Sequence, residues 1–194
     1  MRQRFGQRAI QIVLAIIIVG ALGYGRFGPR ATYPSDWKRF DHAKANVVEV
    51  IDGDTIDVDV MIGDKLVRER IRLLGTDAPE LTDYWGERAM QYTKTRSTRA
   101  PVLIRLDEIE TRDPDGRLLA YVWLAENDML NEALVRDGQA YAYRVRTYQL
   151  SSRIREAEGD AARSRRGIWK EVTQEQMPEW RRAWMKERDL KWPP

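Results

Sequence analysis

Residues 47–74 read VVEVIDGDTIDVDVMIGDKLVRERIRLL and predict three consecutive β-strands. β-Branched residues dominate residues 47–51 and 55–60, and the second run alternates apolar and polar residues with the period of two of a half-buried strand. Asp52-Gly53 and Gly63-Asp64 are typical of tight turns between such strands. The third strand is expected at residues 66–74, so the stretch predicts a three-stranded meander.

The rest of the chain predicts two more strands and three helices. The strands are expected at residues 102–106 and 118–124, and the helices at residues 86–98, 129–136 and 152–166. Asp128 is expected to cap the second helix, and Gly138 and Gly167 to end the second and third. Short strands interspersed with helices predict an α+β fold, a five-stranded antiparallel β-barrel of the OB type covered by three helices.

The two ends of the chain differ from this central region. Arg2, Arg4 and Arg8 precede a largely apolar stretch, residues 9–24, which is the layout of an export signal or a membrane anchor. We expect an uncleaved anchor in residues 1–30 that holds the domain outside the cytoplasm; secretion after signal cleavage is the alternative. Residues 31–45 are interpreted as a linker, residues 46–170 as the folded domain and residues 171–194 as a basic, tryptophan-rich extension.

The C-terminal extension allows three interpretations. It interleaves Trp180, Trp184 and Trp192 with basic side chains. The rings could belong to a helix that packs on the barrel, or they could stack on nucleic-acid bases while the basic groups pair with phosphates. An amphipathic segment that rests on a membrane surface is the third interpretation.

The composition restricts the chemistry that this chain can perform. It contains no cysteine and a single histidine, His42, which lies in a polar run and is interpreted as a surface residue. Disulfides, thiolate catalysis, zinc–thiolate sites and multi-histidine metal sites are therefore excluded. The net charge of +3 permits a nucleic-acid partner, and arginine, which pairs with phosphate bidentately, is abundant. Any catalysis must rely on carboxylates, guanidinium groups, hydroxyls and a hard metal ion.

The first segment with more charge than its local structure requires is VIDGDT, residues 50–55. A hairpin turn explains Asp52 and Gly53 but leaves Asp54 as a second carboxylate beside the turn. Another such segment, Asp115-Gly116-Arg117, is by itself explained by a hairpin turn with a solvated arginine.

The second segment is RIRLLGTDAPE, residues 70–80. Arg70 and Arg72 share a strand face, and Arg72 is expected to lie deep enough to need a partner. Asp77 and Glu80 flank a proline that fixes the backbone between them. Two carboxylates on a stiffened turn, with the free carbonyl of Ala78, suit a hard cation such as Ca²⁺; a salt-bridged surface turn is the alternative.

Taken in chain order, these segments resemble the staphylococcal nuclease (thermonuclease-like) family over residues 47–169. Residues 129–136, MLNEALVR, look like the family's second helix, and Gly167-Ile168-Trp169 is similar to the end of its third. The family's fold, an OB barrel with three helices, agrees with the barrel predicted from the strand pattern.

The resemblance implies a metal site and a general base. Asp54 and Asp77 would bind Ca²⁺ directly, with the backbone carbonyl of Ala78 as a further ligand. Glu80 would act as general base on the attacking water. A metal ion so held would polarise the phosphoryl group.

The resemblance also implies how the phosphate is held. Arg72 and Arg117 would grip it and stabilise the negative charge that develops in the transition state. Asp52, Thr55 and Asp113 would support these groups through hydrogen bonds within their turns.

The chain departs from the family pattern where substrate is bound. The loop after Glu80 is shorter than in the best-known members and lacks lysine, and Asp115 replaces a tyrosine that packs near the nucleotide. Four residues lie near the positions of the family's nucleotide-pocket tyrosines and are the candidate substrate contacts: Tyr141, Tyr143, Arg144 and Arg146.

The expected function is a Ca²⁺-dependent nuclease that hydrolyses phosphodiester bonds of DNA or RNA with little sequence specificity. By resemblance it leaves 3′-phosphate ends, and it is expected to act as a monomer on single-stranded or locally opened nucleic acid. A non-catalytic OB-fold module that binds nucleic acid at the cell envelope is the alternative, and an envelope interaction protein that only shares the fold is another.

Overall fold

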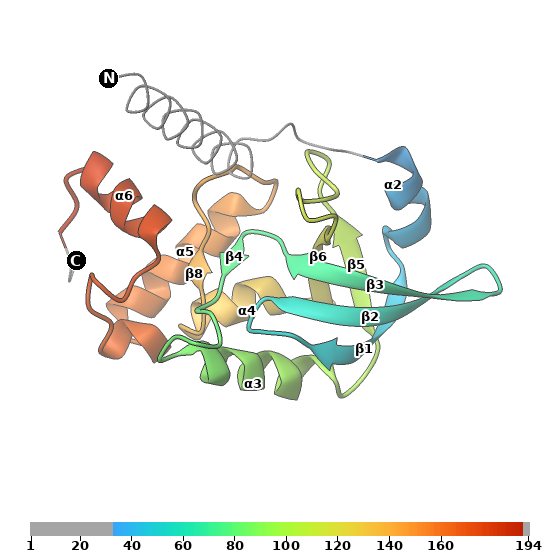
Figure 1. Ribbon diagram of the computed structural model, residues 1–194, viewed down its shortest axis with the longest axis horizontal. Helices are drawn as coiled ribbons and strands as arrows, with labels where there is room; N and C mark the ends of the chain where they lie inside the picture. Colours follow the sequence, from blue (N-terminus) through green and yellow to red (C-terminus); the bar gives the residue numbers. More distant parts are fainter. Residues whose placement is uncertain (1–32, 192–194) are drawn as a thin grey trace, which may run out of the picture.

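The computed structural model of the protein describes residues 33–191 and shows a β-barrel flanked by helices (Figure 1). Within these residues, no helix is long and apolar enough to cross a membrane. The anchor predicted at residues 9–24 lies outside the described residues.

Five strands form the barrel: β1 (Lys44–Val50), β2 (Thr55–Ile62), β3 (Lys65–Leu73), β5 (Val102–Leu106) and β6 (Leu118–Ala125). Their order is β3-β2-β1-β5-β6, and a further pairing between β3 and β6 closes the sheet. This confirms the predicted α+β fold with a five-stranded barrel of the OB type. The barrel is not wholly antiparallel, because β3 and β6 run parallel. A long connection that includes α3 (Gly86–Ser97) and β5 lies between them, as a parallel pair requires.

Alternation along β2 and β3 separates the core from a charged outer face. Ile56, Val58 and Val60 point inward and are fully buried. On the outer face, Asp57 pairs with Arg70 at 2.7 Å, and Asp59 likewise pairs with Arg68. The same register sets Thr55 opposite Arg72, so this row of ion pairs leads into the end of β3.

Three helices lie where the sequence predicted them: α3, α4 (Leu130–Arg136) and α5 (Ser151–Arg163). The prediction that Asp128 caps α4 was wrong. Met129 holds the cap position, while Asp128 lies in the short strand β7 (Asp128–Met129) and accepts hydrogen bonds from Arg96. After α5 the chain continues into a 3₁₀ turn, η1 (Gly167–Lys170).

The structure has several short elements that the sequence did not predict. Residues interpreted as a linker include α2 (Pro34–Phe40), whose Phe40 is fully buried. Two-residue strands β4 (Thr76–Asp77) and β8 (Tyr141–Ala142) pair with each other beside the barrel. Helix α6 (Glu179–Glu187) lies beyond α5 and β8 in Figure 1, at the end of the molecule opposite α2.

The interpretation of His42 as a surface residue is confirmed, since 60% of its side chain is exposed. The extension does form a helix that packs on the domain, but Trp180 and Trp184 pack against a second apolar cluster that includes Tyr141, Ala161 and Trp169, beside the barrel rather than on its strands. Trp192 lies outside the described residues.

Glycine is required where the turn after β1 meets the helical layer. A Cβ atom on Gly53 would lie 2.5 Å from the Cβ of Ala78 and 2.7 Å from that of Ala89. The hydroxyl of Thr93 on α3 donates to the Gly53 carbonyl at 2.6 Å. These contacts hold the turn that carries Asp54 against both α3 and the loop after β4.

Candidate active site

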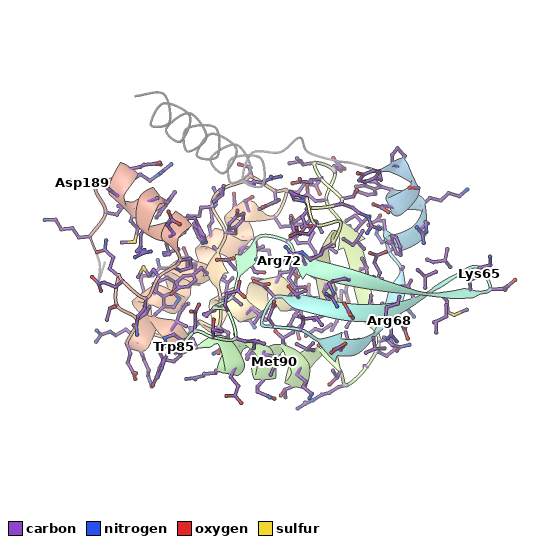
Figure 2. The ribbon with its side chains drawn as sticks, viewed as in Figure 1. Lys65, Arg68, Arg72, Trp85, Met90 and Asp189 are labelled. Carbon is purple, nitrogen blue, oxygen red and sulfur yellow. The ribbon has the colours of Figure 1, made fainter. Side chains whose placement is uncertain are left out.

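The predicted site residues converge where β3 ends. Figure 2 shows Arg72 at the end of β3 beside β4, whereas Arg68 and Lys65 lie toward the hairpin tip. The pairing of Arg72 with Thr55 brings it alongside Asp54, and the Leu73 N–H donates to the Asp54 carbonyl at 2.8 Å. The strand register therefore joins a residue of the first turn to one of the third strand.

Arg72 connects two carboxylates. Its Nη1 lies 2.9 Å from Oδ2 of Asp54, and its Nη2 donates to Oδ1 of Asp77 at 3.0 Å. Nη1 also donates to the carbonyl of Thr76 at 2.9 Å. Only 17% of the Arg72 side chain is exposed. The expectation that this arginine needs a partner is confirmed, because it pairs with both Asp54 and Asp77.

Asp54 is buried at the base of this arrangement. Its Oδ2 accepts a hydrogen bond from the Ala78 N–H at 2.6 Å, and its Oδ1 accepts one from the Thr55 hydroxyl at 3.2 Å. Burial raises the pKa of Asp54 to about 8, although the positive charge of Arg72 opposes that rise. Asp52 supports the turn by accepting the Asp54 N–H at 2.9 Å.

Asp77, at the end of β4, and Glu80, in the loop that follows, lie on either side of Pro79. Burial raises the pKa of Asp77 against the opposing charge of Arg72. Glu80 is exposed; its pKa is raised first by partial burial and then by the negative charges of Asp52 and Asp77. Since these charges act on Glu80, the carboxylates belong to one electrostatic group.

The turn before β6 carries Arg117. Oδ1 of Asp113 accepts the N–H groups of Asp115 and Arg117 at 3.0 and 2.9 Å, and its Oδ2 pairs with Arg117 Nε at 2.7 Å. Gly116 adopts a φ of +79°, which the turn needs between these residues. Asp113 therefore both shapes the turn and orients the guanidinium, as expected of a supporting carboxylate.

A pocket of about 240 Å³ lies between the two predicted phosphate-binding arginines. Its walls include Arg72, Asp77 and Arg117. Asp54 and Glu80 do not line this pocket; Asp54 lies behind the Arg72 guanidinium to which it is paired. The structure thus gathers the two predicted phosphate-binding arginines and Asp77 on a single concave surface, which Glu110, Asp113 and Asp115 also line, and Asp54 lies beneath it.

Two of the four candidate substrate contacts line the pocket, Tyr143 and Arg146. The other two do not line it. Tyr141 is 1% exposed and packs edge-on against Trp169, because β8 turns it into the second apolar cluster. Arg144 turns away from the pocket to pair with Glu158 and to lie over the Trp184 ring.

Sequence reasoning missed residues that hold the site in place. Arg112 donates through Nε and Nη2 to Asp36 of α2 and through Nη1 to Glu69 of β3 and to the Gly116 carbonyl. The turn that carries Arg117 is therefore tied to α2. Asp36 and Arg112 are 76 positions apart, so no local pattern in the sequence could have revealed the pair.

The chemistry of the donor set suits a hard cation. Asp54, Asp77, Asp52 and Glu80 supply only oxygen donors, and Ca²⁺ or Mg²⁺ prefers such donors. The raised pKa values of Asp54 and Asp77 indicate carboxylates with too little positive charge nearby, which a divalent cation would supply. Within residues 33–191, however, no three acidic or histidine side chains are already gathered as a metal cluster, because the Arg72 guanidinium lies between Asp54 and Asp77.

The sequence of this chain is similar to those of known nucleases. Residues 70–171 match the family model described as staphylococcal nuclease homologue. The chain is 32% identical over 167 residues to a thermonuclease of Staphylococcus hyicus, across 82% of this chain and 94% of that protein. It is 31% identical over 148 residues to a micrococcal nuclease of Shigella flexneri, across 72% of this chain and 81% of that protein. It is also 35% identical over 133 residues to a thermonuclease of Staphylococcus intermedius, across 63% of this chain and 74% of that protein.

Proposed function

This protein belongs to the staphylococcal nuclease family and is a hydrolytic nuclease, and from that premise we propose that it cleaves DNA and RNA phosphodiester bonds with a bound Ca²⁺ ion. Cleavage has little sequence specificity and leaves 3′-phosphate ends. The observation that carries the proposal is the placement of Arg72 and Arg117 on one pocket wall together with Asp77.

The two arginines bind the scissile phosphate. Both arginines line a pocket of about 240 Å³, and each already has a carboxylate that fixes its orientation: Asp77 for Arg72 and Asp113 for Arg117. Because the donors are oriented before substrate arrives, they stabilise the developing negative charge with little reorganisation. Tyr143 and Arg146 extend the same wall toward the rest of the nucleotide.

Glu80 takes the proton of the attacking water. Unlike Asp54, it is exposed, so it can reach a water molecule in the solvent-filled site. Burial and the neighbouring carboxylates raise its pKa, which makes it a stronger base than an ordinary glutamate. Proton transfer from water to Glu80 gives a hydroxide that attacks phosphorus, and the bond from phosphorus to the 5′ oxygen breaks on the opposite side. The leaving oxygen keeps the bonding electron pair and takes a proton from solvent water.

Asp54, Asp77 and the Ala78 carbonyl hold the metal ion in this proposal. When bound, Ca²⁺ would supply Lewis-acid polarisation of the phosphoryl oxygens. The all-oxygen donor set and the raised pKa values of both aspartates support the assignment. Arg72 would remain in contact with Asp77 while it turns part of its fork toward the phosphate.

A digestion assay tests the function. Purified protein is incubated with single- and double-stranded DNA and with RNA, with added CaCl₂ or with a chelator, and the ends of the products are analysed. Cleavage that requires the metal and leaves 3′-phosphates is expected. Salt-dependent binding without cleavage in any divalent cation would instead support the non-catalytic OB-fold module.

We also propose that the protein acts as a monomer outside the cytoplasm. The apolar residues 9–24, preceded by Arg2, Arg4 and Arg8, support an anchor to the cell membrane. Nuclease activity in washed membranes would agree with an anchor, activity in the culture supernatant would indicate cleavage of the segment, and activity confined to the cytoplasm would contradict the location.

A further inference from the structure

Helix α6 begins beyond residue 171, where the match to the family model ends, yet it contacts the active site. We propose that Trp180 is a positioning residue of the nuclease centre, whose indole N–H holds the Asp77 carboxylate in the orientation in which it binds the divalent cation. This inference rests on the proposed function and extends it to the C-terminal extension.

The contact is a direct hydrogen bond across 103 positions of sequence. Trp180 Nε1 donates to Oδ2 of Asp77 at 2.7 Å, while Oδ1 of the same carboxylate accepts from Arg72 Nη2 at 3.0 Å. Each oxygen thus has its own donor, and the carboxylate cannot rotate without breaking one of these bonds. A carboxylate oxygen carries two lone pairs, so a cation can still bind an oxygen that already accepts the indole proton.

Trp180 is itself held firmly. Its ring packs edge-on against Tyr143, with centroids 5.2 Å apart, and Tyr143 lines the pocket. The next residue, Arg181, is 6% exposed, pairs with Glu158 at 2.7 Å and lies over the rings of Tyr141, Trp169 and Trp184. A buried guanidinium with this many contacts fixes α6 at the residue that follows the indole.

The same frame holds Asp77 from its backbone. Glu158, which pairs with Arg181, also accepts the Ala142 N–H at 2.8 Å. Ala142 lies in β8, and β8 pairs with β4, the strand that contains Asp77. Helix α5 therefore anchors both the strand that carries the carboxylate and the helix that carries its indole partner, so the 2.7 Å bond joins two parts of one rigid unit.

Packing alone does not require this bond. The indole N–H groups of Trp85 and Trp123 are buried without a hydrogen-bond partner, so tryptophan rings in this protein are also held through their faces and edges, without an N–H hydrogen bond. In contrast, the Trp180 N–H reaches a carboxylate of the active site. Partners that orient a metal ligand typically change metal affinity 10- to 100-fold when they are removed.

The test compares Trp180→Phe with Trp184→Phe in the full-length protein. Phenylalanine at 180 keeps a ring against Tyr143 and removes the N–H donor. Trp184 lies on the same helix, is also partly buried and packs against the second apolar cluster, and its ring lies near arginine side chains rather than at an active-site carboxylate. Calorimetric titration with CaCl₂, without nucleic acid, is expected to show affinity lowered about tenfold or more in Trp180→Phe and less than threefold in Trp184→Phe. Equal affinity in Trp180→Phe and the unmodified protein would overturn the inference.

A second measurement uses the unmodified protein and does not depend on how the variants fold. In ¹⁵N-labelled protein, the indole signal of Trp180 is identified as the one that is missing from the spectrum of Trp180→Phe. If that variant does not fold, the signal is identified as the indole signal that broadens with Mn²⁺. This signal should shift on titration with CaCl₂, and the midpoint of the shift should equal that of the calorimetric binding curve. If CaCl₂ binds and no indole signal shifts, the inference is overturned. If the unmodified protein binds no divalent cation and cleaves nothing, the proposed function fails too. If it binds Ca²⁺ and cleaves nucleic acid while Trp180→Phe binds Ca²⁺ equally well, only the role of Trp180 is contradicted.

Discussion

Nη1 of Arg72, which lines the pocket, lies 2.9 Å from Oδ2 of Asp54, which is buried beneath it. Burial raises the pKa of Asp54 even though the guanidinium is so close. The pair therefore contains a carboxylate that is only partly compensated and a cation that already has two acidic partners. Divalent metal and phosphate, arriving together, would satisfy both groups, which links the geometry of this pair to the chemistry proposed for the site.

Replacement of Glu80 by glutamine should abolish most of the nuclease activity. The amide cannot accept the proton of the attacking water, so kcat should fall by about 10²–10⁴-fold. Because Glu80 is exposed, the free energy of unfolding should stay within about 0.5 kcal/mol of the unmodified protein. Glu87→Gln, at an exposed glutamate in the first turn of α3, is the control and should retain full activity. Undiminished kcat in Glu80→Gln would remove Glu80 from its role.

Replacement of Arg117 by alanine should lower activity more than stability. The guanidinium lines the pocket and is held by Asp113, so its loss should cost about 2.7–4 kcal/mol of transition-state stabilisation, seen in kcat/KM. Arg68→Ala removes an exposed arginine from a similar carboxylate pair on the outer face of β3 and should leave kcat/KM unchanged. Equal loss in both variants would mean that Arg117 contributes only general positive charge.

The metal-free protein should lose stability as pH rises from about 5 to 8, and Asp54 should be one cause. Its pKa in the folded protein is raised to about 8 from 3.8, so over this range the folded state holds a proton that the unfolded chain releases. Stability is then highest on the acid side and falls as pH approaches the folded-state pKa.

Urea unfolding of the unmodified protein and of Asp54→Asn, both with chelator, isolates this contribution. Between pH 5 and pH 8, the unfolding free energy of Asp54→Asn should rise by about 1–4 kcal/mol relative to that of the unmodified protein. The reason is that each unit of pKa shift corresponds to about 1.4 kcal/mol. Asn keeps an oxygen that accepts the Ala78 N–H but cannot ionise. Parallel pH profiles for the two proteins would show that Asp54 has an ordinary pKa.

Replacement of Arg112 by methionine should loosen the turn that carries Arg117. It leaves Asp36, which is 3% exposed, without its cationic partner and should cost about 3–5 kcal/mol of unfolding free energy. Because the freed turn no longer holds Arg117 in place, KM for nucleic acid should also rise. Arg153→Met breaks a more exposed pair with Glu132 and should cost less than about 1 kcal/mol. Identical stability losses in the two variants would contradict the structural role of α2.

The positions of the long elements follow from local rules, and the sequence predicted them within a few residues. Alternation in β2 and the Asp52-Gly53 turn together specify the β1–β2 hairpin. Both features depend only on residues that are close in sequence, so they do not depend on the rest of the fold. Helix α2 escaped prediction because its stability depends on contacts of Phe40 and Asp36 with distant parts of the chain. The supposed cap Asp128 failed for the same reason, since an ion pair with Arg96 outweighs a local hydrogen bond.

The sequence by itself determined the set of reactive groups: a protein with no cysteine and one histidine must use carboxylates and arginines, and their order along the chain indicated the family. Only the tertiary structure decided which of those groups meet. Barrel closure and strand register place Arg72 between Asp54 and Asp77, the fold of β8 buries Tyr141 while leaving Tyr143 at the pocket, and α6 delivers Trp180 to Asp77. Spacing along a chain fixes the face of a strand or helix that a residue occupies, but contacts between residues far apart depend on how all the elements pack together.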